Sequence, residues 1–131
     1  MSEKEASLKK FREYCIEYFG EVPEHHERMA KYTPDIITSW VNFRSTTWKK
    51  PEEGGHLPIK FKELLAVGIE TATMKAHVGH VEKAIDAGAT VEEVAEVLGI
   101  CIMLAGMESY AIGGKGALER AEKRAKELGR L

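Results

Sequence analysis

The sequence predicts an all-α fold, and two observations carry that prediction. Apolar residues recur at intervals of three and four along most of the 131-residue chain, which is the period of a helix with one buried face. No segment shows the alternation of apolar and polar residues, rich in β-branched side chains, that is typical of a strand. Because a chain of this length builds one hydrophobic core, we expect residues 1–131 to form a single domain.

The first 48 residues predict three helices, at about 7–19, 23–30 and 34–48. Gly20 follows the last apolar residue of the first helix and is suited to end it. Thr33 followed by Pro34 indicates a helix start, with threonine as the N-cap and proline at the first helical position. Residues 49–58 then bring charge, two glycines and two prolines, which is typical of a connecting loop.

The second half of the chain predicts three further helical segments. A long helix begins at Ile59, and its apolar pattern continues through residue 85 before Gly88 stops it. Thr90 and Glu93 have the spacing of a capping box that opens a strongly apolar helix at 91–107. Glycines at 113–116 precede a last charged helix at 117–128. The apolar helix is broad enough to form the centre of the core or of a subunit contact, so we expect an oligomeric helical bundle.

Charge and composition exclude several functions. Lysine and arginine number 19 against 21 acidic residues, a net charge of −2, which lacks the basic surface that nucleic acids require. The longest apolar run, 97–107, is too short to span a membrane. The charged N-terminus does not resemble a secretory signal, so a cytoplasmic protein is predicted. Cys15 and Cys101 have no redox or zinc-ligand spacing and are expected to be structural thiols.

The candidate chemistry lies in the segment from residue 63 to residue 80. On a continuous helix, Glu63, Glu70, His77 and His80 share one side. Imidazole beside carboxylate is suited to acid and base catalysis near neutral pH, and the same groups could ligate a divalent metal. A solvated helix face carries such residues as well. The spacing leaves these three interpretations open.

Three segments of the chain resemble the carboxymuconolactone decarboxylase family, which includes the alkylhydroperoxidase D-like proteins. They are MAKYTPDII at 29–37, LPIKFKELLAV at 57–67 and GHVEKAIDAGATVEEV at 79–94. The likeness covers about residues 21–118, and its most specific parts are the start of the long helix and the histidine before the AlaGlyAla turn. It implies an all-helical bundle that assembles as a trimer or hexamer, with sites between helices near subunit contacts.

Two branches of the family imply different chemistry. The peroxidase-like branch carries a CxxC motif before the histidine, but here Thr73 and Ala76 occupy the cysteine positions. Neither can form a thiolate, so dithiol chemistry by the family mechanism is excluded. The decarboxylase branch keeps the histidine without the cysteines and removes carbon dioxide from a small unsaturated lactone acid without metal or organic cofactor. The sequence is closer to this second pattern.

The resemblance assigns expected roles to individual residues. His80 is expected to act as general acid or base, with His77 or Glu63 orienting it. The interval from Glu63 to His80 is about two residues shorter than in the family, so Glu70 is kept as an alternative carboxylate near the substrate. Arg44 and Lys75 are candidates for binding a substrate carboxylate. The predicted function is therefore a cofactor-free, metal-free enzyme, a lyase, acting on a small molecule; a non-catalytic oligomeric binding protein and a hydroperoxidase are the alternatives.

Overall fold

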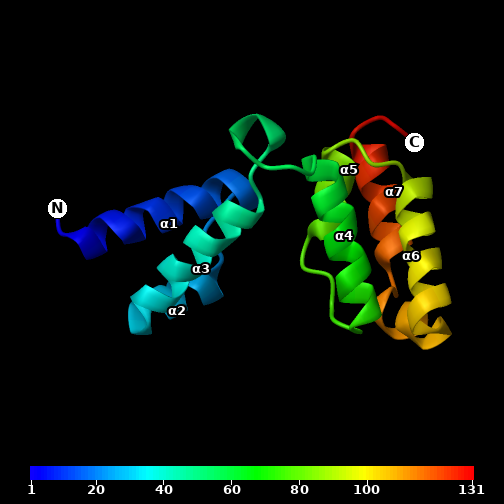
Figure 1. Ribbon diagram of the computed structural model, residues 1–131, viewed down its shortest axis with the longest axis horizontal. Coiled ribbons are helices and arrows are strands. Elements are labelled where there is room, and N and C mark those ends of the chain that lie inside the picture. Colours follow the sequence, from blue (N-terminus) through cyan, green and yellow to red (C-terminus); the bar gives the residue numbers. More distant parts are fainter. The chain divides into compact units, whose positions relative to one another are not determined.

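The computed structural model describes residues 1–131, and every regular element in it is helical. This confirms the all-α prediction. The chain divides into two compact units, residues 1–49 and residues 50–131, which are described separately (Figure 1). That the whole chain forms one domain stays a prediction.

The N-terminal unit contains three helices, α1 (Glu3–Phe19), α2 (Glu24–Tyr32) and α3 (Pro34–Thr47). Helix α3 packs against both α1 and α2. Helix α1 begins four residues before the predicted start, because Ser2 and Glu5 form a capping box there that extends the helix beyond its apolar stripe. The core of this unit is formed by Phe11, Tyr14, Cys15, Ala30, Ile37 and Val41.

The start of α3 was only partly predicted. Pro34 does occupy the first turn, but the side chain of Thr33 makes no capping hydrogen bond. Its hydroxyl instead donates to the carbonyl of Met29, at 3.1 Å, and so binds to the last turn of α2. Thr33 is the single residue between α2 and α3. Its hydroxyl can therefore either accept from an amide at the start of α3 or donate to a carbonyl at the end of α2, and it donates to the carbonyl.

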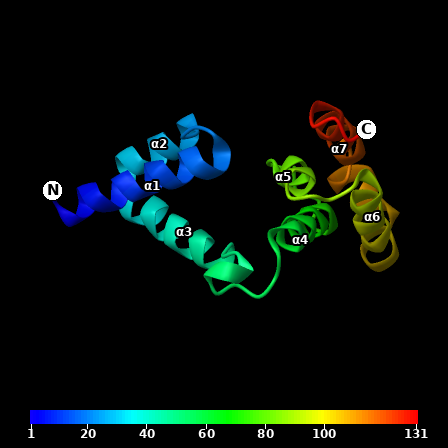
Figure 2. The ribbon, with the colours of Figure 1, turned by 90° about the horizontal axis from the view of Figure 1, so that it is seen from above.

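The C-terminal unit begins with a short 3₁₀ turn, Pro51–Glu53, and continues with α4 (Ile59–Ala72), α5 (His80–Asp86), α6 (Val91–Ala105) and α7 (Ala117–Glu127). Helix α4 packs against α5 and α6, and α7 packs against the same two helices (Figures 1 and 2). A π-helical turn, Ser109–Gly113, joins α6 to α7 and contacts α4.

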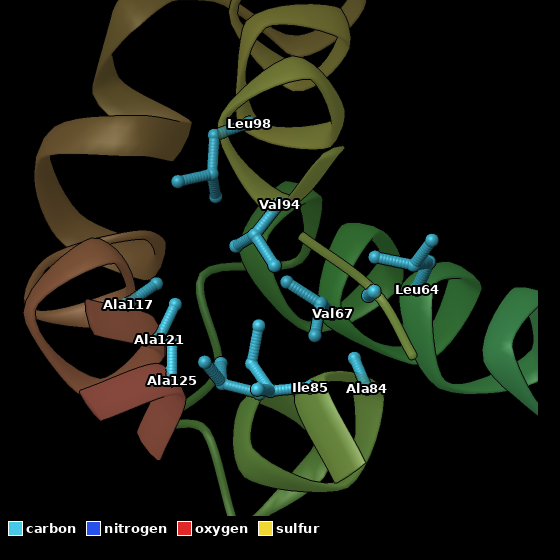
Figure 3. Packing of buried hydrophobic residues seen from close by; sticks show 11 residues of the cluster. Leu64, Val67, Ala84, Ile85, Val94, Leu98, Ala117, Ala121 and Ala125 are labelled. Atoms are coloured by element: carbon cyan, nitrogen blue, oxygen red, sulfur yellow. The ribbon is translucent and has the colours of Figure 1, made fainter. Parts of the chain in front are cut away.

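Small residues bring these helices close together around an apolar centre. Three alanines of α7, Ala117, Ala121 and Ala125, are nearly inaccessible to solvent and belong to the same buried cluster as Ile85 of α5 (Figure 3). From the other side, α4 and α6 contribute Val67, Val94 and Leu98. Since a buried alanine needs little room, a seven-residue helix such as α5 can be enclosed by longer neighbours on two sides.

The prediction of one long helix from residue 59 to residue 85 is wrong. Helix α4 ends at Ala72 and α5 starts at His80, with a loop between them. At the end of α4, the Thr73 hydroxyl donates to the Ile69 carbonyl at 2.7 Å, and Met74 adopts a left-handed conformation with φ 57°. Gly79 has φ 121°, which glycine adopts without strain. The sequence did not reveal the loop, because the segments on both sides of it are helical and both have helical apolar spacing.

Helix α6 has the predicted start. The Glu93 amide donates to the Thr90 hydroxyl at 3.0 Å, and the Thr90 amide donates to the Glu93 carboxylate at 2.9 Å, which confirms the capping box. Further along α6, Met103 and Leu104 are 75% and 77% exposed, so the helix covers the core with one side and presents apolar side chains on another. None of the helices combines the length and the apolar character needed to cross a membrane.

Candidate functional site

The first component of the site is a close contact between Glu63 and His80. His80 Nδ1 donates to Glu63 Oε2 over a distance of 2.6 Å. Glu63 lies in the second turn of α4 and is 3% exposed, whereas the side chain of His80, the first residue of α5, is 20% exposed. A carboxylate this deeply buried is costly unless it is paired, and the imidazole provides the partner.

This contact determines how the imidazole can act. A carboxylate that accepts from Nδ1 fixes the ring orientation and favours the tautomer protonated at that nitrogen. The carboxylate also stabilises the imidazolium that forms when the ring takes up a second proton. Proton exchange with a bound molecule would then take place at Nε2. A histidine held in this way is able to serve as a general base and then as a general acid.

The second component is a looser pair formed by Glu70 and His77. The distance from His77 Nδ1 to Glu70 Oε1 is 3.5 Å, and both atoms are buried without a hydrogen bond. On the other side of the ring, His77 Nε2 lies 3.4 Å from the Thr71 hydroxyl, which donates to the Val67 carbonyl. That hydroxyl can therefore only accept from His77, so Nε2 carries a proton, and Nδ1 of the neutral form presents a lone pair to Glu70.

Arg120 of α7 fixes the loop that precedes His80. Its guanidinium donates to both carboxylate oxygens of Glu82, at 2.5 and 2.7 Å, and to the His77 carbonyl at 3.0 Å. Burial raises the pKa of Glu82, but the hydrogen bonds and charge of Arg120, a backbone hydrogen bond and the nearby His77 together outweigh it, and the net pKa is below the usual value. Arg120 thus holds the end of the loop against the first turns of α5, where His80 lies.

Neither Arg120 nor Glu82 was among the predicted site residues. They are 38 positions apart, on different helices, and neither lies in a recognisable motif. A charged residue on an amphipathic helix normally indicates a solvated face. The pairing depends on α7 packing beside α5, and no local pattern in the sequence indicates that neighbour.

The structure brings together four of the predicted site residues, but as two pairs. Each histidine faces its own glutamate, and nowhere do three or more metal-ligand side chains converge. Lys75 is exposed on the loop between α4 and α5, and Arg44 belongs to the N-terminal unit. The predicted roles of Arg44, Lys75 and Glu70 toward a substrate stay predictions.

The two cysteines are poorly suited to thiolate chemistry. Both are buried and unpaired. Burial raises the pKa of the Cys15 thiol, and the nearby Glu27 raises it further. Burial also raises the pKa of Cys101, although the Ala72 backbone acts against it, and the Cys101 thiol donates to the Gly68 carbonyl at 3.3 Å. Reactive cysteines need the opposite environment, one that lowers the pKa.

Comparison with known proteins places this helical chain in a family. Residues 34–123 match the carboxymuconolactone decarboxylase family. A protein from Burkholderia xenovorans LB400, proposed to be a carboxymuconolactone decarboxylase, has a crystal structure of the same fold, with a TM-score of 0.85 and 27% sequence identity over 96% of each chain. The comparison with curated proteins gave no match.

The chain belongs to the carboxymuconolactone decarboxylase family, because the family match covers more than half of its residues. The resemblance noted in the sequence is confirmed. Both members of the Glu63–His80 pair and both members of the Glu70–His77 pair lie within the matched range.

Proposed function

We propose that Glu63 and His80 form the acid–base centre of a cofactor-free enzyme that decarboxylates a small lactone acid or a closely related compound. The observation that carries the proposal is the 2.6 Å contact between His80 Nδ1 and the buried Glu63 carboxylate. Family membership supports the class of reaction, and the partial exposure of His80 is consistent with access by a small molecule.

The proposed reaction requires a site for electrons and a source of one proton. The bond between carbon and the departing carboxylate breaks, and its electron pair delocalises into the conjugated lactone. A protonated His80 beside the lactone carbonyl stabilises the negative charge on that oxygen and supplies the proton that returns to carbon. Glu63 is the positioning residue, since it acts on the substrate only through the imidazole.

The decisive experiment measures carbon dioxide release from a panel of small unsaturated lactone acids. His80→Gln is expected to keep the fold and to lower turnover about 10²- to 10⁴-fold, the usual contribution of one acid or base group. His56→Gln is the matched control, because His56 is exposed in the loop before α4, and it should leave turnover unchanged. Changing Cys15 and Cys101 together to Ala should leave the activity per folded molecule intact.

Other outcomes identify the alternative functions. A parent protein that binds members of the panel without turnover would be a binding protein. Loss of activity in the cysteine variant, with His80→Gln fully active, would overturn the proposal in favour of thiol chemistry.

The exposed apolar side chains of the C-terminal unit support self-association. On α4, Phe61, Leu65 and Ile69 follow one another at intervals of four residues and are 46%, 52% and 62% exposed. Together with Met103 and Leu104 of α6 they form more apolar surface than a small monomer usually leaves to water. Sedimentation is expected to give a trimer or hexamer, and Leu104→Lys should shift it toward monomer. A parent that stays monomeric at micromolar concentration would contradict this.

A further inference from the structure

One arginine of the N-terminal unit is enclosed by aromatic rings. The guanidinium carbon of Arg44, in the last turn of α3, lies 5.5 Å from the ring centres of Tyr14 and Tyr18. The rings of Phe19 and Trp48 lie at 5.2 and 5.0 Å. Cation–π attraction within about 6 Å is favourable, and it holds the side chain in a defined position.

Arg44 differs from the other arginines in what balances its charge. Four others make an ion pair with a carboxylate, and Arg130 donates to the Ile85 carbonyl. The four pairs are Arg12 with Glu27, Arg28 with Glu24, Arg120 with Glu82 and Arg124 with Asp86. Arg44 makes no ion pair with a carboxylate, and its side-chain interactions are with the four rings and the Tyr14 hydroxyl.

The hydrogen bonds of Arg44 leave one edge of the guanidinium available. Its Nη1 donates to the Tyr14 hydroxyl. Nε and Nη2 make no hydrogen bond to the protein, and neither is among the buried polar atoms that lack a partner, so solvent reaches both. These two nitrogens form the fork that binds the two oxygens of a carboxylate side by side.

We propose that Arg44 and the rings around it bind a carboxylate that is attached to a flat apolar group. The fork provides two charge-assisted hydrogen bonds, and the negative charge of the ligand compensates a cation that has no acidic partner. The rings offer an apolar surface on which a flat ligand can stack. All residues of the site lie between 14 and 48, in the N-terminal unit, so the site does not depend on the function proposed for Glu63 and His80.

Benzoate is the probe that fits this chemistry. Binding to the full chain is measured by calorimetry and by the fluorescence of the tryptophans, one of which, Trp48, borders the site. Benzamide has the same shape without the charge, and acetate has the charge without the ring. We expect benzoate to bind at least about tenfold more tightly than either, because each comparison ligand lacks one of the two interactions.

Variants locate the binding. Arg44→Lys keeps the charge but loses the fork, so benzoate should bind about tenfold more weakly. The matched control is Arg28→Lys, because Arg28 is an exposed arginine on α2 that pairs with Glu24; it should bind as the parent does. His80→Gln should also bind as the parent does, which separates this site from the acid–base centre.

Several outcomes would overturn the proposal. Equal binding of benzoate and benzamide by the parent protein would show that charge plays no part, and this test needs no variant. Unchanged binding in a folded Arg44→Lys protein would place the ligand elsewhere. Absence of saturable binding in the parent would mean that Arg44 only connects α3 to α1 through Tyr14.

Discussion

His80 and His77 are three residues apart in the chain and each faces a glutamate of α4, yet the two pairs differ in almost every physical respect. His80 donates to Glu63 at 2.6 Å and is partly open to solvent. His77 lies 3.5 Å from Glu70, its side chain is 3% exposed, and the facing atoms have no hydrogen bond. The first pair is close and partly open to solvent, as the proposed proton exchange requires, whereas the second is enclosed by the structure around it.

The difference arises from where each glutamate lies along α4. Glu63 and Glu70 are seven residues apart, which places them on nearly the same face but about 10 Å apart along the axis. The loop from Thr73 to Gly79 turns back beside α4. It therefore delivers His80 to the earlier turn and leaves His77 beside the later one. Similar composition thus gives two sites whose chemistry is set by the path of the backbone.

The largest expected effect is the difference in turnover between two variants in which the same substitution is made at Glu63 and at Glu70. Glu63→Gln should lower turnover about 10- to 10⁴-fold, because the amide no longer stabilises the imidazolium or fixes its tautomer. Glu70→Gln should leave turnover within about twofold and should raise the melting temperature slightly, since its amide can donate to the lone pair at His77 Nδ1. Carbon dioxide release and thermal unfolding of both variants measure the contrast.

Equal losses of turnover in the two variants would show that the pairs act together. A lowered melting temperature in Glu70→Gln would show that His77 is protonated and forms an ion pair with Glu70, which would contradict the neutral ring on which this prediction rests.

The next effect tests the backbone that holds His77. A Cβ on Gly113 would lie 2.3 Å from the Thr71 carbonyl oxygen and 3.0 Å from Met74 Cα, so Gly113→Ala must displace the end of α4. We expect a loss of about 2 to 4 kcal/mol in the free energy of unfolding. Gly99→Ala is the matched control on α6, where a Cβ meets no atom within 4 Å, and it should gain about 0.5 to 1 kcal/mol.

Chemical denaturation of the two alanine variants measures both values. An unchanged free energy of unfolding in Gly113→Ala would mean that the π-helical turn can move away from α4 without loss of stability. The position of the loop that carries His77 and leads to His80 would then have to be set by Arg120 alone.

The smallest effect concerns His26, which has no carboxylate in contact with its ring. Its neighbours are Phe11, Phe19, His25 and Trp40, and Nδ1 is buried without a partner. Burial lowers the pKa of His26, and the nearby His25 lowers it further. The unfolded chain therefore binds the proton more tightly. The stability linked to neutral His26 should be fully present above about pH 6.5. It should fall as the pH decreases from there toward the lower pKa of His26 in the folded state.

Thermal unfolding of the N-terminal unit, followed by tryptophan fluorescence between about pH 8 and pH 5, measures this dependence. His26→Gln should remove most of it, and His25→Gln should keep most of it. The stability that the Arg12–Glu27 pair contributes is lost in a separate, lower pH range, because the hydrogen bond from Arg12 lowers the pKa of Glu27. An identical pH dependence in His26→Gln would contradict the assignment.

The sequence by itself determined the helical class, most helix positions and the two glutamates and two histidines that are the candidate site residues. Helical periodicity, the Thr90–Glu93 capping box and proline at the start of α3 are local features, encoded within a few residues and therefore readable without a structure. The resemblance around Glu63 and His80 was readable for the same reason. The family match confirms it.

Only the tertiary structure decided how those residues are paired. The break after Ala72 depends on a left-handed Met74 and on the close approach of Gly113 to Thr71, and the sequence pattern shows neither. The Arg120 contact with Glu82 and three of the four rings around Arg44 come from helices that are distant in sequence. Periodicity shows which side of a helix is buried, but the partner of that side is selected by packing among all the helices, and this is the physical reason why the two glutamate–histidine pairs had to be seen in three dimensions.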